Sequence, residues 1–295
     1  MQTSDSKPDR HYELVSTLTP DGVKLQGLFQ RAQEKKSVSL DAAIVLHGLA
    51  GNFYGSSLNL GLADELGSLG IAVAVVNTRG HDNISTSRVA GRAKTLGAAY
   101  EIVDDCRHDV AGWIDWMRQR GYANVGLIGH SLGAIKALYA AAQLQDESIK
   151  AIVGLSATRL CHASFLQSER AADFRKWIRT AQEEVELGNA HKLMQVDFPF
   201  PTHMAAGAYR DKYGPEDRYD WTRYVDLINV PTLLVFGERE LQKNAAFQGL
   251  EEIARDICKT REPFSMTVIE SANHFYAGVQ HRAMRAVKEW IEERL

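Results

Sequence analysis

Short apolar runs alternate with longer segments of helical spacing along most of the chain. Strands are expected at 42–46, 71–76, 125–128, 149–155, 232–236 and 265–269, and the run 42–46 is of the kind expected of a strand covered on both faces. Segments with apolar residues at helical spacing separate or follow them, at 58–69, 102–117, 134–144, 246–257 and 278–294. This alternation predicts an α/β fold with a mostly parallel sheet and helices on both faces.

Two regions depart from this rhythm near the N-terminus. Residues 11–18 and 24–31 flank Thr-Pro-Asp-Gly, a turn signal, and are expected to pair as an antiparallel hairpin. The stretch 78–98 is rich in Gly, Ser, Asn and Arg without periodicity, so we expect a loop there.

The alternation also fails between residues 157 and 225. Two helical segments are expected at 163–172 and 174–187, followed by an irregular stretch at 194–221. We therefore predict a core formed by residues 1–156 and 226–295, interrupted by an insertion at 157–225. The insertion carries eight large side chains, Phe165, Trp177, Phe198, Phe200, Met204, Tyr209, Tyr213 and Trp221. They either line a pocket or seal the insertion to the sheet. Two or three of them are expected to touch a substrate.

Charge and cysteine content exclude several classes of protein. The 295 residues include 34 Lys and Arg against 37 Asp and Glu, giving a formal net charge of -3, so nucleic acid is not an expected partner. The opening residues are polar and no apolar segment is long enough for an export signal or a membrane span. The three cysteines, Cys106, Cys161 and Cys258, lack metal-binding spacing, and an odd count argues against a disulfide framework. A cytoplasmic protein is expected.

The sequence Gly129-His-Ser-Leu-Gly133 lies between an apolar strand and an alanine-rich helix. This is the Gly-x-Ser-x-Gly pattern in the strand–turn–helix context that it requires. Such a turn projects Ser131 from the edge of the sheet and leaves the N–H groups at the helix start directed at the same place. The alternative interpretation is a glycine-rich turn with a capping serine.

With this motif the chain resembles the α/β-hydrolase family over nearly its whole length, from the first hairpin to the last helix. The resemblance implies a mostly parallel sheet of about eight strands and a mostly helical cap over the active site. It implies a nucleophile, an acid and a base in that chain order. These positions correspond to Ser131, to Glu240 three residues past a glycine, and to His274 after the last strand. Glu replaces the more usual Asp, and Glu238 remains a competing candidate for the acid.

The resemblance also implies two backbone donors for a reaction oxyanion, the N–H groups of Leu49 and Leu132. Leu49 belongs to His47-Gly-Leu-Ala-Gly51, which is similar to the family's His-Gly loop. We expect His47 to hold this loop, and Arg79 and His81 to pin the loop after the next strand. No metal or other cofactor is expected, because ligand spacings and phosphate-binding loops are absent from the sequence.

These features predict a serine hydrolase that cleaves a small or medium carboxylic ester. Amide or peptide, thioester and C–C bond hydrolysis use the same three residues and remain open, as does a ligand-binding protein without turnover. The sequence identifies neither the small-molecule substrate nor the oligomeric state.

Overall fold

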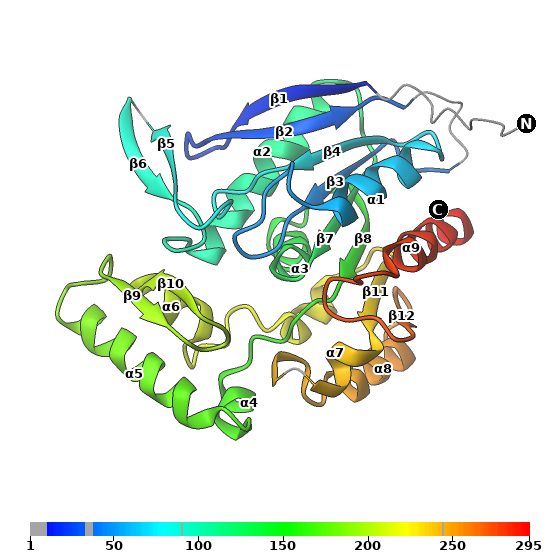
Figure 1. Cartoon of the computed structure of the whole chain (residues 1–295). Coiled ribbons are helices and arrows are strands. Elements are labelled where there is room, and N and C mark those ends of the chain that lie inside the picture. Colours follow the sequence, from blue (N-terminus) through cyan, green and yellow to red (C-terminus); the bar gives the residue numbers. More distant parts are fainter. Residues whose placement is uncertain (1–10, 33–37, 90, 244) are drawn as a thin grey trace, which may run out of the picture.

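An eight-stranded sheet forms the centre of the protein, seen in a computed structural model that describes residues 11–32, 38–89, 91–243 and 245–295 (Figure 1). The strands follow the order β1 (Tyr12–Leu18), β2 (Lys24–Gln30), β4 (Ala72–Val76), β3 (Ala42–Leu46), β7 (Val125–His130), β8 (Ile149–Leu155), β11 (Thr232–Gly237) and β12 (Phe264–Ile269). β1, β2 and β4 pair antiparallel, and every pairing from β4 to β12 is parallel. The predicted fold class is confirmed. The polar opening segment lies outside the described residues.

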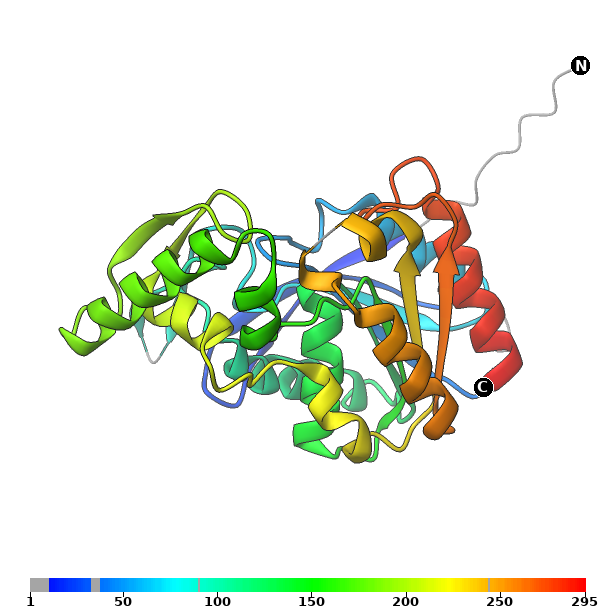
Figure 2. The same cartoon turned by 90° about the horizontal axis from the view of Figure 1, so that it is seen from below.

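Helices cover both faces of the sheet (Figure 2). α1 (Ser57–Gly67) and α9 (Gln280–Arg294) pack on one face, and α2 (Cys106–Arg118), α3 (Leu132–Leu144) and α8 (Leu250–Thr260) pack on the other. A short 3₁₀ turn, η1 (Val103–Asp105), leads into α2.

Residues of the central strands alternate between the two layers. Val45 and Val73 pack with α1 and α9, whereas Ile44 and Ala74 pack with α2 and α3. All four side chains are fully buried, and burying a valine or isoleucine side chain stabilises the fold by about 1.5–3 kcal/mol. Burial on both faces explains why these strands are continuous apolar runs rather than alternating sequences.

The segment between β8 and β11, which we call the insertion, forms a separate group of elements beside the sheet (Figure 1). It contains α4 (His162–Gln167), α5 (Ala171–Glu186), β9 (Leu193–Val196), β10 (Thr202–Ala205), α6 (Ala206–Tyr213) and η2 (Trp221–Leu227). The irregular structure expected at 194–221 is wrong, because β9 and β10 form an antiparallel hairpin and α6 follows it directly. Strands this short leave too few residues for a pattern to be recognised.

The loop prediction for 78–98 is wrong in part, because this stretch contains a second hairpin. β5 (Ser85–Val89) pairs with β6 (Arg92–Leu96) in a separate two-stranded sheet. Its side chains are polar and mostly exposed on both faces, so the alternation of apolar and polar residues that signals a strand is missing.

Three contacts attach the insertion to the segment 97–105 of the core. The Ala205 N–H donates to the Ala99 carbonyl (2.7 Å). The Val103 N–H donates to the Asp211 carboxylate (3.0 Å), and the Asp104 N–H donates to the Tyr219 hydroxyl (2.8 Å). Two further short elements, α7 (Glu238–Lys243) and η3 (Ala245–Phe247), follow β11. Over the ranges that the structure describes, no helix combines the length and apolar character needed to cross a membrane.

Candidate active site

Ser131 occupies a tight turn between β7 and α3. Its backbone has φ 57° and ψ -122°, a conformation that costs a non-glycine residue free energy. The turn is possible because Gly129 and Gly133 lack side chains: a Cβ at Gly129 would lie 2.1 Å from the Gly133 carbonyl oxygen, and one at Gly133 would lie 2.4 Å from that of Leu46. The alternative of a capping serine does not describe this turn, since the Ser131 side chain makes no capping hydrogen bond to α3.

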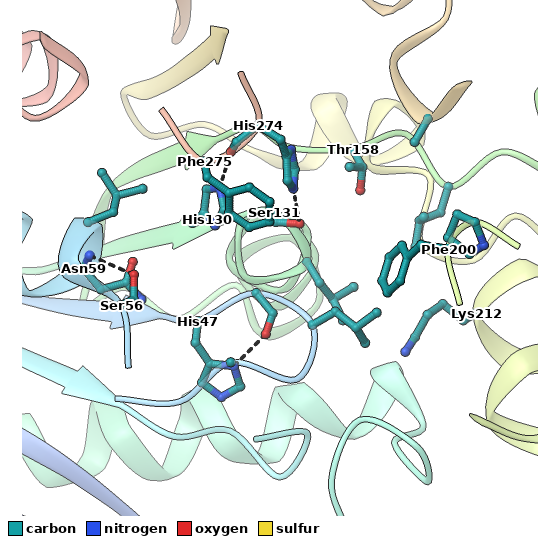
Figure 3. A pocket seen from close by; sticks show the side chains of 18 of the residues that line it. His47, Ser56, Asn59, His130, Ser131, Thr158, Phe200, Lys212, His274 and Phe275 are labelled. Carbon is teal, nitrogen blue, oxygen red and sulfur yellow. Dashed lines mark hydrogen bonds between the residues drawn. The ribbon is translucent and has the colours of Figure 1, made fainter. Parts of the chain in front are cut away.

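Ser131, His274 and Glu240 form a continuous hydrogen-bonded series, of which Figure 3 shows the contact between Ser131 and His274. His274 Nε2 lies 2.9 Å from Ser131 Oγ, and His274 Nδ1 lies 2.7 Å from Glu240 Oε2. With Nδ1 donating to the carboxylate, Nε2 is left as an acceptor. An imidazole in this arrangement can take the Ser131 proton while the carboxylate stabilises the charged ring.

The Glu240 carboxylate is buried and held by groups other than the imidazole. Its Oε1 accepts from the Gly237 N–H (2.7 Å) and from the Ser156 hydroxyl (2.8 Å). Tyr276 Oη lies 2.9 Å from Ser156 Oγ and donates to the Val235 carbonyl (2.9 Å). Sequence reasoning missed Ser156 and Tyr276, because neither belongs to a motif that marks it.

The competing candidate Glu238 points elsewhere. Its Oε2 accepts from the Ser271 N–H (2.7 Å) at the turn after β12. Only one of the two candidate acids therefore reaches His274.

The loop after β3 approaches Ser131 closely. A Cβ at Gly48 would lie 3.2 Å from the Cβ of Ser131, closer than an ordinary van der Waals contact, so the glycine lets this loop approach the serine. The Leu49 N–H makes no backbone hydrogen bond in the described chain, and Leu132, as the first residue of α3, has no intrahelical acceptor. Both predicted donors are thus available near Ser131.

His47 fixes the conformation of that loop. Its Nδ1 lies 2.7 Å from the Gly48 carbonyl oxygen, and its Nε2 accepts from the Thr78 N–H (3.1 Å). Burial, with the nearby Lys136 charge, lowers the pKa of His47 to about 3, so the ring is neutral. Nδ1 therefore carries the proton and donates it to Gly48.

His130 lies beside His274 and contacts its backbone. Its Nε2 lies 2.7 Å from the His274 carbonyl oxygen, and the two rings lie 5.0 Å apart. Burial lowers the pKa of His130 to about 4, which keeps the ring neutral, so it donates to that carbonyl from Nε2. This contact places His130 beside the loop that carries His274 rather than against Ser131.

The loop after β4 is held by ionic contacts. Arg79 is buried and pairs with Asp109, Asp21 and Asp105, while His81 Nδ1 lies 2.9 Å from Asp82. Among the described residues, no group of three or more His, Cys, Asp or Glu side chains could hold a metal ion.

A cavity of about 840 Å³ opens over Ser131 and His274. On one side it is lined by the start of α1, including Ser56 and Asn59, and on the other by the insertion (Figure 3). Of the eight large insertion side chains singled out in the sequence, four line the cavity, Phe165, Phe198, Phe200 and Tyr213, and the other four do not. Lys212 also lines it, and sequence reasoning did not point to that residue.

Comparison with known proteins assigns the family. The sequence model of a protein family, described as the alpha/beta hydrolase fold, matches residues 42–194, which is more than half of the chain. The protein therefore belongs to the α/β-hydrolase fold family. The resemblance described in the sequence is confirmed. A comparison with curated proteins finds no match.

Solved structures extend the likeness to the whole chain. Est1E from Butyrivibrio proteoclasticus, solved with ferulic acid, is 18% identical with a TM-score of 0.65, covering 94% of this chain and 98% of its own. The Pyrococcus furiosus esterase Pf2001 is 16% identical with a TM-score of 0.61, covering 97% and 93%. The alpha/beta hydrolase GrgF from Penicillium sp. sh18 is 13% identical with a TM-score of 0.69, covering 96% and 99%. At these identities the likeness establishes the fold.

Proposed function

We propose that this protein is a serine hydrolase that cleaves a small or medium carboxylic ester through an acyl-enzyme intermediate. The observation that carries the proposal is the pair of hydrogen bonds joining Ser131, His274 and Glu240 at the floor of the cavity. One of the similar structures described above, Pf2001, is an esterase by name, which favours an ester over the other substrates that the same three residues can cleave.

In this mechanism Ser131 Oγ attacks the ester carbonyl while His274 Nε2 takes its proton. The tetrahedral intermediate then collapses: the C–O bond to the alcohol breaks, and His274 returns the proton to the departing oxygen. A water molecule attacks the acyl-enzyme in the same way, with His274 again as base, and releases the acid. Glu240 holds the Nδ1–H tautomer and stabilises the imidazolium.

The oxyanion of each intermediate would be held by the N–H groups of Leu49 and Leu132. A donor of this kind typically contributes about 10²–10³ in rate. The close approach of the Gly48 backbone to Ser131 supports this role for the loop. The insertion, whose aromatic side chains line the cavity, would act as a cap that shields the reaction from water.

The proposal is tested with p-nitrophenyl esters of graded acyl length and with a fluorophosphonate probe that labels active serines. Wild type is expected to turn over the esters and to be labelled, and both properties should vanish in Ser131→Ala. The matched control is Ser87→Ala on the β5–β6 hairpin, which should behave as wild type.

The results of labelling and ester turnover together show which part of the proposal would be wrong. Labelling without ester turnover would mean that the serine is active on another substrate class. Absence of both in the wild type would contradict catalysis and favour a ligand-binding protein. Turnover that survives in Ser131→Ala would place the chemistry elsewhere.

A further inference from the structure

Lys212, near the end of α6, is a buried cation that lines the cavity. Its side chain is only 3% exposed, yet Nζ has no hydrogen-bond partner among the described residues. Figure 3 shows the side chain below Phe200, on the side of the cavity that the insertion forms. Burying an ammonium group without a partner costs several kcal/mol, so its presence requires an explanation.

The nearest buried carboxylate is already paired with another lysine. Glu101 Oε1 lies 2.5 Å from Lys136 Nζ, which also donates to the Thr78 hydroxyl (2.8 Å). All three charged side chains, Glu101, Lys136 and Lys212, are buried. Two ammonium groups therefore share this carboxylate, and the other carboxylate whose charge acts on Lys212, Asp211, accepts hydrogen bonds from the Val103 N–H and the Tyr219 hydroxyl.

The other cation at the cavity is neutralised by the protein. Arg170 pairs with Asp173 (2.9 Å) and donates to the carbonyls of Pro199 and Asp197. Among the described residues that line the cavity there is no Asp or Glu. Nothing in the cavity wall thus compensates Lys212.

The remaining wall near Lys212 is apolar. It is formed by Leu160 and by the aromatic side chains of Phe165, Phe198 and Tyr213, among others. A ligand that fits this side needs an apolar stem and, where it reaches Nζ, an anionic oxygen that accepts a charge-assisted hydrogen bond.

We propose that Lys212 selects ester substrates whose portion beneath the insertion is an apolar stem ending in a carboxylate. Lys212 would bind that carboxylate and so orient the ester carbonyl at Ser131, acting as a specificity-determining residue. This inference rests on the proposed hydrolase function. Burial lowers the pKa of Lys212 to about 8, while the charge of Glu101 acts in the opposite direction, so the ammonium form prevails at neutral pH.

The test uses pairs of substrates that differ only in a terminal carboxylate or carboxamide. One series places this group on the acyl chain, in p-nitrophenyl esters of the dicarboxylic acids from adipyl to sebacyl. The other places it on the alcohol, in acetyl esters of ω-hydroxyalkanoic acids. The measured quantity is the ratio of kcat/KM for the carboxylate to that for the carboxamide.

Wild type is expected to prefer the carboxylate in at least one series. In Lys212→Met this ratio should fall about 10- to 100-fold, the value of one hydrogen bond to a charged group. Lys212→Arg should retain most of the preference. The matched control is Lys192→Met, which removes an exposed insertion lysine that pairs with Glu184 and should leave the ratio unchanged.

An unchanged ratio in Lys212→Met would overturn the proposal and leave Lys212 as a structural partner of Glu101. In that case thermal unfolding of Lys212→Met should occur at a lower temperature than in wild type. Under the proposal the melting temperature should not fall, because the variant removes a buried charge that has no partner.

Failure of the hydrolase proposal is recognised separately, by wild type that neither labels with the fluorophosphonate nor cleaves either member of any pair. Binding then decides: octanoate should raise the melting temperature of wild type more than octanamide does, and the difference should disappear in Lys212→Met. Equal effects of the two ligands on wild type and variant would refute the anion site.

Discussion

Ser156 Oγ lies 2.8 Å from Glu240 Oε1, so the residue that follows β8 holds the carboxylate that follows β11. Ser156 itself has φ 50°, a left-handed conformation that a serine adopts at a cost in free energy. The Ser156 N–H donates to the Val235 carbonyl (2.7 Å), which keeps the residue in register with β11. The two neighbouring strands thus fix the orientation of Glu240 together.

We expect Ser156→Ala to lower kcat about tenfold, because Glu240 loses one of its hydrogen bonds and holds His274 less firmly. KM should change little, since Ser156 does not line the cavity. Steady-state kinetics on a p-nitrophenyl ester measure both constants. Ser156→Gly is the matched variant, because glycine accepts a positive φ but also lacks the hydroxyl. Should it keep full activity, the backbone rather than the hydroxyl would be responsible.

Glu240 and Glu238 provide a direct comparison of two neighbouring carboxylates. Glu240→Gln should lower kcat by about 10⁴, as expected when the group that fixes the imidazole tautomer becomes neutral. Glu238→Gln should retain activity within about twofold, because its carboxylate binds the Ser271 N–H and not the imidazole. The measurement is kcat for both variants at the same pH. Similar losses in both would contradict the assignment of the acid.

Arg79 is expected to contribute more to stability than an exposed arginine. Its guanidinium donates to Asp109, whose side chain is completely buried, as well as to Asp21 and Asp105. Arg79→Met leaves the Asp109 charge buried and unpaired, so the free energy of unfolding should fall by about 3–5 kcal/mol in urea denaturation. The control is Arg107→Met, which breaks a partly exposed pair with Asp104 and should cost less than about 1 kcal/mol.

A double variant checks the cause of that loss. Replacing Asp109 by Asn in the Arg79→Met background removes the buried charge and should recover part of the stability. If Arg79→Met is no less stable than Arg107→Met, the buried ion pair does not contribute the expected stability.

The preference for carboxylate substrates should depend on pH. Burial lowers the pKa of Lys212 to about 8, with Glu101 and Asp211 raising it and Lys136 lowering it. The ammonium form, which attracts the carboxylate, is present below this pKa and is lost as the pH rises through it. The carboxylate-to-carboxamide ratio of kcat/KM in wild type should therefore be constant at neutral pH and fall above about pH 8.

Taking the ratio cancels titrations that affect both substrates equally. In Lys212→Arg the ratio should stay constant over the same range, because a guanidinium remains charged. A wild-type ratio that does not change with pH would contradict the assignment of the anion preference to Lys212.

Most of the sheet could be predicted because its strands are buried on both faces. Mostly apolar runs predict β3, β4, β7, β8 and β11, whose side chains are nearly all buried, whereas β12 at the edge of the sheet is only partly buried. The β5–β6 hairpin was missed for the opposite reason, since both of its faces are mostly exposed and polar. A sequence pattern predicts a strand from the apolar side chains that the strand buries. It gives no signal where a strand buries few of them.

The positions of Ser131, His274 and Glu240 could be predicted from local motifs, whereas the groups around them could not. Ser156 contacts Glu240 across 84 residues of chain and has no motif of its own. One signal was available: Lys136 is the only charged residue in the alanine-rich α3, and a lone lysine in a buried helix implies a buried partner. The partner, Glu101, becomes evident only in three dimensions.

The charged side chains at and beside the cavity come from two separate parts of the chain. Lys212 belongs to the insertion, whereas Glu101 and Lys136, which set its electrostatic surroundings, belong to the core. Since β8 and β11 are adjacent parallel strands, another insertion could be grafted between them without altering the sheet register. Such a chimera would gain or lose the ammonium group but keep the buried pair beneath it. Under the proposed role of Lys212, substrate range would therefore not be transplanted with the insertion alone, and both parts would have to change together.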